Sequence, residues 1–189
     1  TNPDGSHTFL IGYYNRNWVS EVDVPIGPSN HFEPGDPDRG QPTHFLPNRG
    51  FGMFTVTVPK DTPPTEKLWW VLTVNGVTQR VPFHRSPDYN ITPQRASEEG
   101  PGGKYNKPAI LRFSEGGPAI QNPEATIAKA PERIATVGMP MALDFWVEDD
   151  ALYSSGSNAP PTSTPRIVEI VVAKYRGPGT VTVAKDHEK

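Results

Sequence analysis

The chain has 189 residues, enough for one large β domain or two small ones. Its formal net charge of −3 creates no positive field of the kind that nucleic acid or an anionic membrane attracts. The sequence has no cysteine, which excludes disulfides and thiol catalysis, and no apolar run long enough to span a membrane. A hydrophobic content of 34%, with 23 prolines and 17 glycines, predicts small cores and long loops.

Two strands are predicted at the start of the chain. Residues 6–15 carry apolar or aromatic side chains on both faces, which is typical of a strand covered on two sides. Residues 18–25 alternate between a face with two carboxylates and a mostly apolar face, so one face of this strand is expected to be solvated.

Prolines and glycines interrupt every pattern between residues 26 and 49, apart from a short run at 43–46 that could pair with a sheet. We expect this segment to be ordered and to lie over the first sandwich, because it contains apolar residues that a free linker does not need: Phe32, Phe45 and Leu46. Residues 51–59 are predicted as a strand whose inward set is Phe54, Val56 and Val58.

The strongest structural signal is the segment 67–83, where two β-favouring runs flank Asn75-Gly76. A two-residue type I′ turn at this pair fixes the register: Val74 with Val77, Leu72 with Gln79, Trp70 with Val81, and Leu68 with Phe83. All but Gln79 are apolar, so we expect these residues to form one buried face. The opposite face is expected to carry Trp69, Val71, Thr73, Thr78, Arg80 and Pro82.

The second half of the chain also predicts short strands and no amphipathic helix. Small and polar residues predict a linker at 96–107 and a surface loop at 151–165. Strands are expected at 89–92, 109–113, 125–128, 133–137 and 141–147, with a hairpin of 166–175 and 180–184 around Arg176-Gly177-Pro178-Gly179. The predicted class is all-β, with two immunoglobulin-like β-sandwich domains in series (1–95 and 108–189) and long Pro/Gly-rich loops.

Several of these stretches resemble known families. Gly-Tyr-Tyr-Asn-Arg-Asn-Trp at 12–18, with residues 24–28, 40–47, 51–59 and the Trp-containing hairpin, resembles uncharacterised secreted bacterial β-sandwich proteins. Residues 136–140, 147–150 and 174–183 resemble an immunoglobulin-like or PKD-like module. The resemblance implies an exported, periplasmic or extracellular protein with no assigned activity. Such modules usually continue beyond the point where this chain stops, so an open edge in the second domain is one expectation.

Two acidic groups are candidates for a calcium site, because Ca²⁺ prefers oxygen ligands. Glu148-Asp149-Asp150 directly follow a strand, although a further ligand would have to come from elsewhere in the chain. The second group lies in the Pro/Gly segment: Glu33, Asp36 and Asp38. For both groups the alternative is a solvated cluster that forms turns without an ion. We therefore predict neither a metal nor another cofactor.

Catalytic patterns are not found in the sequence. A zinc site would need distant loops to converge, because the histidines are scattered: His7, His31, His44, His84 and His187. Neither Ser6-His7 nor Ser86 near His84 lies in a nucleophile-elbow setting. We expect a protein that is not an enzyme. A hydrolase with an unrecognised site, such as two carboxylates across a cleft, is the last-ranked alternative.

Aromatic residues are the better functional signal, because domains this small cannot bury all of them: Tyr13, Tyr14, Trp18, Trp69, Trp70 and Trp146. Exposed Tyr and Trp on a β face either stack on sugars or anchor a protein interface, unless Pro-rich loops cover them. We expect a structural or interaction protein, an accessory subunit docked on a larger envelope or periplasmic-face membrane complex, whether respiratory, photosynthetic, secretory or filamentous. The alternative is a carbohydrate-binding module.

The predicted interface is the second face of the hairpin, or else the open edge of the second domain. Its expected residues are Trp69, Val71, Arg80 and Tyr14. The expected partners are proteins, with neither nucleic-acid binding nor membrane insertion.

Overall fold

The computed structural model describes residues 1–90, 109–121, 131–149 and 170–184. Regular structure in these residues consists of strands and one short 3₁₀-helix (Pro87–Tyr89), so the all-β class is confirmed. Contacts divide the chain into unit 1, Thr1–Ser86 with Val171–Lys189, and unit 2, Pro87–Ile170. The sequence-based division instead placed all of 108–189 in one domain. The predicted linker at 96–107 lies outside the described residues.

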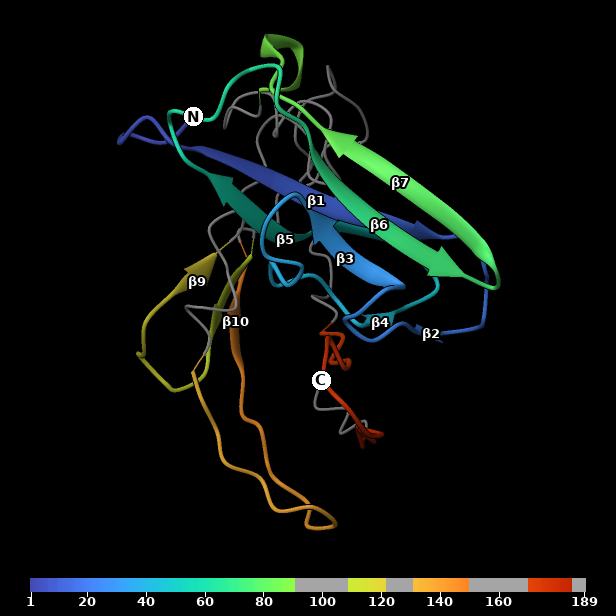
Figure 1. The fold of residues 1–189 in the computed structure, drawn as a ribbon. Helices are drawn as coiled ribbons and strands as arrows, with labels where there is room; N and C mark the ends of the chain where they lie inside the picture. Colours follow the sequence, from blue (N-terminus) through green and yellow to red (C-terminus); the bar gives the residue numbers. More distant parts are fainter. Residues whose placement is uncertain (91–108, 122–130, 150–169, 185–189) are drawn as a thin grey trace, which may run out of the picture. The chain divides into compact units, whose positions relative to one another are not determined.

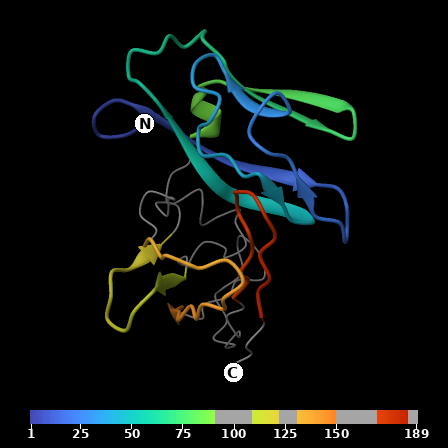
Figure 2. The same cartoon turned by 60° about the horizontal axis from the view of Figure 1, so that its bottom comes forward.

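The two larger antiparallel sheets of unit 1 form facing layers (Figures 1 and 2). One pairs β1 (His7–Asn15) with β5 (Asn48–Val58). The other has the order β3-β6-β7, with β3 at Asn30–Glu33, β6 at Leu68–Val74 and β7 at Val77–Phe83. A short ladder joins β2 (Val22–Asp23) to β4 (His44–Phe45).

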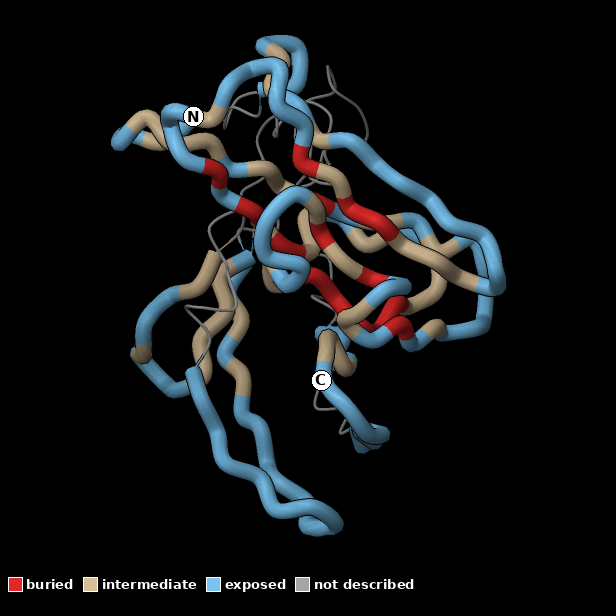
Figure 3. Tube along the Cα trace, viewed as in Figure 1, coloured by how far each residue is buried: buried red, intermediate tan, exposed pale blue. Residues whose placement is uncertain are grey.

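The core of unit 1 lies between these two sheets, and Figure 3 shows the buried residues along the strands. Trp70 is 5% exposed; its ring stacks on Phe32 at 5.9 Å between centroids and meets Phe54 edge-on at 5.3 Å. Alternation along β5 buries the predicted inward set, which is confirmed. The buried apolar cluster consists of Ile11, Val24, Phe32, Phe45, Phe54, Val56, Val58, Leu68 and Trp70.

The register of the central hairpin is confirmed at every predicted pair, and Asn75 and Gly76 have φ angles of 51° and 75°, as a type I′ turn requires. Two expectations about its faces are wrong. Val77 and Val81 are 63% and 42% exposed, because β7 is the edge strand among the described residues, with β6 as its one paired neighbour there. Val71 is 8% exposed, because β6 is the middle strand and both of its neighbours flank this residue.

Residues 26–49 are described in full, but they include β3, a strand that the sequence pattern did not predict. Asn30 is fully buried, donates hydrogen bonds to the carbonyls of Val24 (2.8 Å) and Pro42 (2.9 Å), and accepts one from Trp70 Nε1 (2.9 Å). Gln41 is also fully buried and bonds the backbone of its own loop. These amides hold a segment that has few ladder hydrogen bonds of its own.

Several predicted strands differ in extent from those in the structure. Of the strand predicted at 18–25, only β2 is a strand in the structure, and of the run at 43–46, only β4. The strand predicted at 51–59 corresponds to β5, which begins earlier, at Asn48. Residues 133–137 form no strand, Tyr89 lies in the 3₁₀-helix, and the described part of the predicted hairpin, 170–184, has no strand. The predictions for 125–128 and 151–165 lie outside the described residues.

Unit 2 has a small antiparallel sheet of order β10-β8-β9. Its strands are β8 (Ile110–Arg112), β9 (Ile120–Gln121) and β10 (Trp146–Glu148). Phe113 and Phe145 pack at 5.4 Å between ring centroids, and Arg112 pairs with Glu148. No residue in the described part of unit 2 is fully buried. Two immunoglobulin-like sandwiches therefore stay a prediction.

No helix in the described part of the chain is long and apolar enough to cross a membrane.

Candidate functional site

The predicted interface face of the hairpin is largely occupied by its own side chains. Arg80 lies over the ring of Trp69 at 3.8 Å from the centroid, with Lys67 at 5.8 Å. The Arg80 guanidinium also pairs with Glu33 at 2.6 Å, which links all three strands of the sheet. With Val71 buried between its neighbours, this face offers a polar, internally paired surface and not the apolar patch that the sequence suggested. The interface role of these residues stays a prediction.

A second surface lies at the paired end of β1 and β5, where three large rings are exposed. Tyr14 is 46%, Trp18 78% and Phe51 72% exposed. Tyr14 stands opposite Arg49, whose guanidinium lies 4.4 Å from the ring centroid. The Asn48 amide donates to the carbonyl of Asn17 at 3.3 Å, which brings the residue before Trp18 beside β5. Exposed aromatic rings beside an arginine can stack on a sugar ring or form part of a protein interface.

The shape of this end depends on a bulge that the sequence did not predict. Between Ile11 and Tyr13, β1 advances by two residues while its partner moves by four, from Phe54 to Gly50. A Cβ at Gly12 would lie 2.3 Å from the Gly50 carbonyl oxygen, so only glycine permits this close approach.

A third surface is the loop of residues 131–145 in unit 2, which Figure 1 shows running away from the sheet and returning to β10. Its tip is a turn closed by a hydrogen bond from the Met139 amide to the Thr136 carbonyl at 3.0 Å. Apolar side chains along the loop are exposed: Ile134 99%, Val137 102%, Met139 66%, Met141 42% and Leu143 43%. The sequence predicted strands at 133–137 and 141–147, but not the loop.

Within unit 1, residues 171–184 contact the 1–86 part through four successive residues, Lys174–Gly177. The Tyr175 carbonyl accepts hydrogen bonds from the amides of Thr43 (3.1 Å) and His44 (3.2 Å), and its hydroxyl donates to the Gly40 carbonyl (2.6 Å). Burial raises the pKa of Tyr175, so this hydroxyl keeps its proton at neutral pH. The Gly177 amide donates to Thr43 Oγ1 at 3.1 Å.

Two ion pairs flank Tyr175. Lys174 pairs with Asp23 at 3.0 Å, and Arg176 pairs with Asp38 at 2.6 Å. The hydrogen bond from Lys174, and to a smaller extent the bond from His44, lower the pKa of Asp23. The hydrogen bond from Arg176 lowers the pKa of Asp38. The predicted hairpin at 166–184 is therefore wrong in its described part, because this backbone bonds to residues about 130 positions earlier and not to itself.

The acidic candidates are engaged with the protein itself. Glu33 bonds Arg80, Asp36 accepts from the Asp38 amide at 3.0 Å, and Asp38 accepts from the Gly40 amide at 3.0 Å besides pairing with Arg176. Glu148 pairs with Arg112, while Asp150 lies outside the described residues. Among the residues that the structure describes, no cluster of three or more acidic or histidine side chains is arranged to hold a metal ion.

Ser6 and His7 bond to different partners. Ser6 Oγ donates to Asp4 at 2.7 Å, whereas the His7 ring contacts Thr1 and Arg85, so Ser6 and His7 do not form a catalytic pair. Desolvation, followed by the Arg85 charge, lowers the pKa of His7. His44 is 9% exposed and lies between Asp23 (3.1 Å) and Glu21 (3.3 Å). His187 lies outside the described residues.

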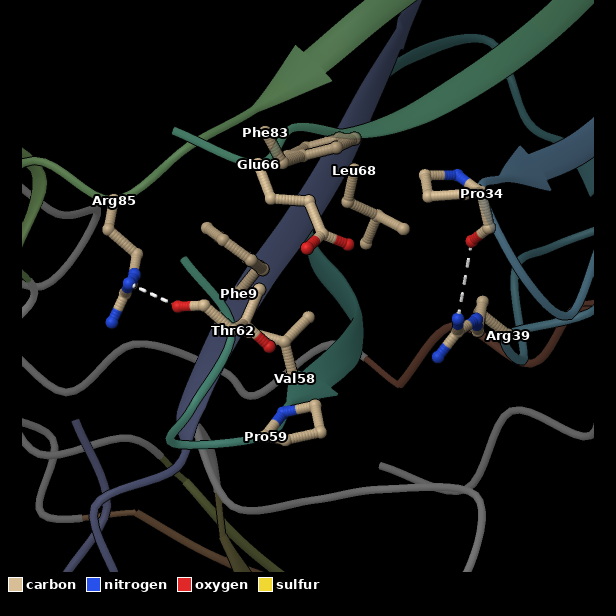
Figure 4. A pocket seen from close by; sticks show the side chains of 10 residues that line it. All are labelled: Phe9, Pro34, Arg39, Val58, Pro59, Thr62, Glu66, Leu68, Phe83 and Arg85. Carbon is tan, nitrogen blue, oxygen red and sulfur yellow. Dashed lines mark hydrogen bonds between the residues drawn. The ribbon is translucent and has the colours of Figure 1, made fainter. Parts of the chain in front are cut away.

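A small cavity lies at one end of unit 1 (Figure 4). It measures about 90 Å³, the space of a few water molecules, whereas pockets for organic ligands enclose roughly 300–1,000 Å³. One cation in the cavity lining, the Arg85 guanidinium, is already engaged, because it donates a hydrogen bond to the Thr62 carbonyl at 2.6 Å. The lining residues are Phe9, Pro34, Arg39, Val58, Pro59, Thr62, Glu66, Leu68, Phe83 and Arg85.

Comparisons with protein-family models, curated proteins and solved structures found no match.

Proposed function

We propose that the protein binds another protein and performs no catalysis, and that its contact surface is the 131–145 loop of unit 2. The observation that carries this proposal is the exposure of Ile134 and Val137, at 99% and 102%. Leaving apolar surface in water costs roughly 25 cal/mol per Å², so a run of such side chains is typical of a surface that a partner covers. Met139 and Met141 add flexible side chains that adapt to a partner.

The remaining parts of the proposal rest on the sequence. Resemblance of residues 12–47 to secreted bacterial proteins supports a periplasmic or extracellular location and an accessory role in an envelope or membrane-associated complex. The facing sheets of unit 1 support an immunoglobulin-like sandwich in that unit. The three short strands of unit 2 support a smaller immunoglobulin-like sandwich that is less closed.

The test compares complexes in the cells that make the protein. Ile134→Asp/Val137→Asp places charge on the loop, while Val19→Asp is a matched control on an exposed valine of unit 1 (87%). In native gels we expect wild type and control in one complex larger than the free chain, and the double variant as free, folded protein. Finding the double variant in that complex, or the wild type as free chain, would refute the proposal.

A second function is favoured by a different observation, the exposed rings at the end of β1 and β5. Trp18 and Phe51 would stack on sugar rings, and Arg49 beside Tyr14 would donate hydrogen bonds to hydroxyl or carboxylate groups of a glycan. Affinity electrophoresis in gels that contain polysaccharide tests this function. Retardation of wild type that is lost in Trp18→Ala and kept in Ile134→Asp/Val137→Asp would favour the carbohydrate module over docking, and equal mobility of all variants would exclude it for those polysaccharides.

A further inference from the structure

The contacts of Lys174–Gly177 have the form of a bound peptide. Recognition of extended peptides combines main-chain hydrogen bonds, which give affinity, with one anchored side chain and flanking contacts that give specificity. Here the Tyr175 carbonyl and the Gly177 amide bond to the Thr43–His44 backbone and the Thr43 hydroxyl. Tyr175 is the anchor, since it packs against the core cluster of unit 1 and its hydroxyl bonds the Gly40 carbonyl.

Charge selects basic residues on both sides of the tyrosine. Asp23 and Asp38 bind the basic residues on either side of the tyrosine, and both carboxylates have further donors that keep them in place. A phenylalanine in place of Tyr175 would leave the Gly40 carbonyl without its donor, and acidic flanking residues would be repelled.

We propose that the surface formed by Asp23, Asp38, Gly40 and Thr43 is a peptide-recognition site for the pattern basic–Tyr–basic–Gly, occupied here by the chain's own Lys174–Gly177 and able to bind the same segment of a second copy. The segment has no strand pairing of its own in the described residues, and its contacts fall on four successive positions. It can therefore leave and rebind as a unit. Exchange of such an element between copies is a low-cost route to a dimer.

The test uses two full-length variants that are defective in opposite ways. Tyr175→Ala/Arg176→Ala keeps the site and lacks the ligand, whereas Asp23→Asn/Asp38→Asn keeps the ligand and lacks both carboxylates. Mixing the ligand-deficient variant with wild-type chain at high concentration should give a 1:1 heterodimer by sedimentation. Mixing it with the site-deficient variant should give a larger fraction of heterodimer, because the Lys174–Gly177 segment of the site-deficient variant is no longer held in its own chain. Neither variant should dimerise alone. No heterodimer in either mixture would overturn the proposal.

A synthetic peptide of residues 172–180 provides a measurement that tolerates partial unfolding of a variant. In fluorescence anisotropy it should bind the ligand-deficient chain, and also the milder Arg176→Ala chain, at least tenfold more tightly than wild type, whose tethered segment competes. A peptide with phenylalanine in place of the tyrosine should bind the ligand-deficient chain several-fold more weakly. Equal binding to wild type and both variants, or binding to none of them, would contradict the proposal.

Discussion

At the scale of single residues, Trp70 is the side chain on which both sheets of unit 1 converge. Its ring contacts Phe32 from its own sheet, Phe54 from the facing sheet and Phe45 from β4. Trp70→Ala should lower the free energy of unfolding by roughly 3–5 kcal/mol. Denaturant titration measures this, with Trp18→Ala as the exposed control, for which we expect a change below about 0.5 kcal/mol. Similar losses in both variants would mean that Trp70 is not in a core.

Asn30 joins the core to the irregular segment. Asn30→Ala removes two donors and one acceptor in a buried site, which leaves the Val24 and Pro42 carbonyls and the Trp70 indole without partners. We expect a loss of roughly 3 kcal/mol or more in the free energy of unfolding, because each unsatisfied buried group costs about 1–3 kcal/mol. Asn17→Ala, an exposed asparagine, is the control and should cost less than about 1 kcal/mol. Equal costs would show that the Asn30 bonds contribute little.

At the scale of elements, β7 is an exposed edge that its own sequence protects. In a two-residue hairpin the closing pair, Val74 and Val77, is hydrogen-bonded, so alternate residues of β7 direct their backbone groups away from β6. Pro82 falls on one of these outward positions and has no N–H to offer. Pro82→Thr should therefore raise self-association, seen by light scattering as a mass that increases with concentration. Thr78→Val, on the same face, is the control, and unchanged scattering by Pro82→Thr would contradict this account.

Acid should release the 171–184 segment from the 1–86 part of unit 1. Asp23 and Asp38 have pKa values lowered by their bonds to Lys174 and Arg176, so they stabilise the docked state above the ordinary aspartate pKa near 4. That stabilisation is lost as pH falls through the lowered values. Amide exchange of Thr43 and His44, corrected for intrinsic rates, should accelerate between about pH 4 and pH 2. Asp23→Asn/Asp38→Asn should show fast exchange already at neutral pH. Exchange independent of both pH and substitution would argue against these ion pairs.

Elements set by local chemistry were predictable from the sequence, and those set by distant partners were not. Asn75-Gly76 and its flanking alternation define the hairpin without help from the rest of the chain. β3 is only four residues long and gains its stability from pairing with β6, forty positions later. Val71 shows the same limit, because its burial depends on that pairing.

The candidate sites follow the same division. Exposure of Tyr14 and Trp18 could be anticipated from the excess of rings over core. The site around Tyr175 could not, since Lys-Tyr-Arg beside Thr-Val-Thr-Val is also typical of a hairpin, and nothing local points to Gly40 or Thr43.

At the scale of the whole molecule, the chain of unit 1 is interrupted by unit 2. Residues 171–189 return to the unit formed by residues 1–86. The two units also differ in core: unit 1 has nine buried apolar residues in one cluster, whereas the described part of unit 2 has none. Burial of apolar surface is the main stabilising contribution to a domain, so we expect the cluster of unit 1 to stabilise that unit.

A photo-crosslinking residue at position 137, in the cells that make the protein, tests the docking proposal most directly. The same residue at position 57, on the exposed strand face of unit 1 at Thr57, is the control. Our account predicts one discrete adduct from position 137, none from position 57, and loss of that adduct when Ile134→Asp is added. No adduct from position 137, or the same adducts from both positions, would contradict it.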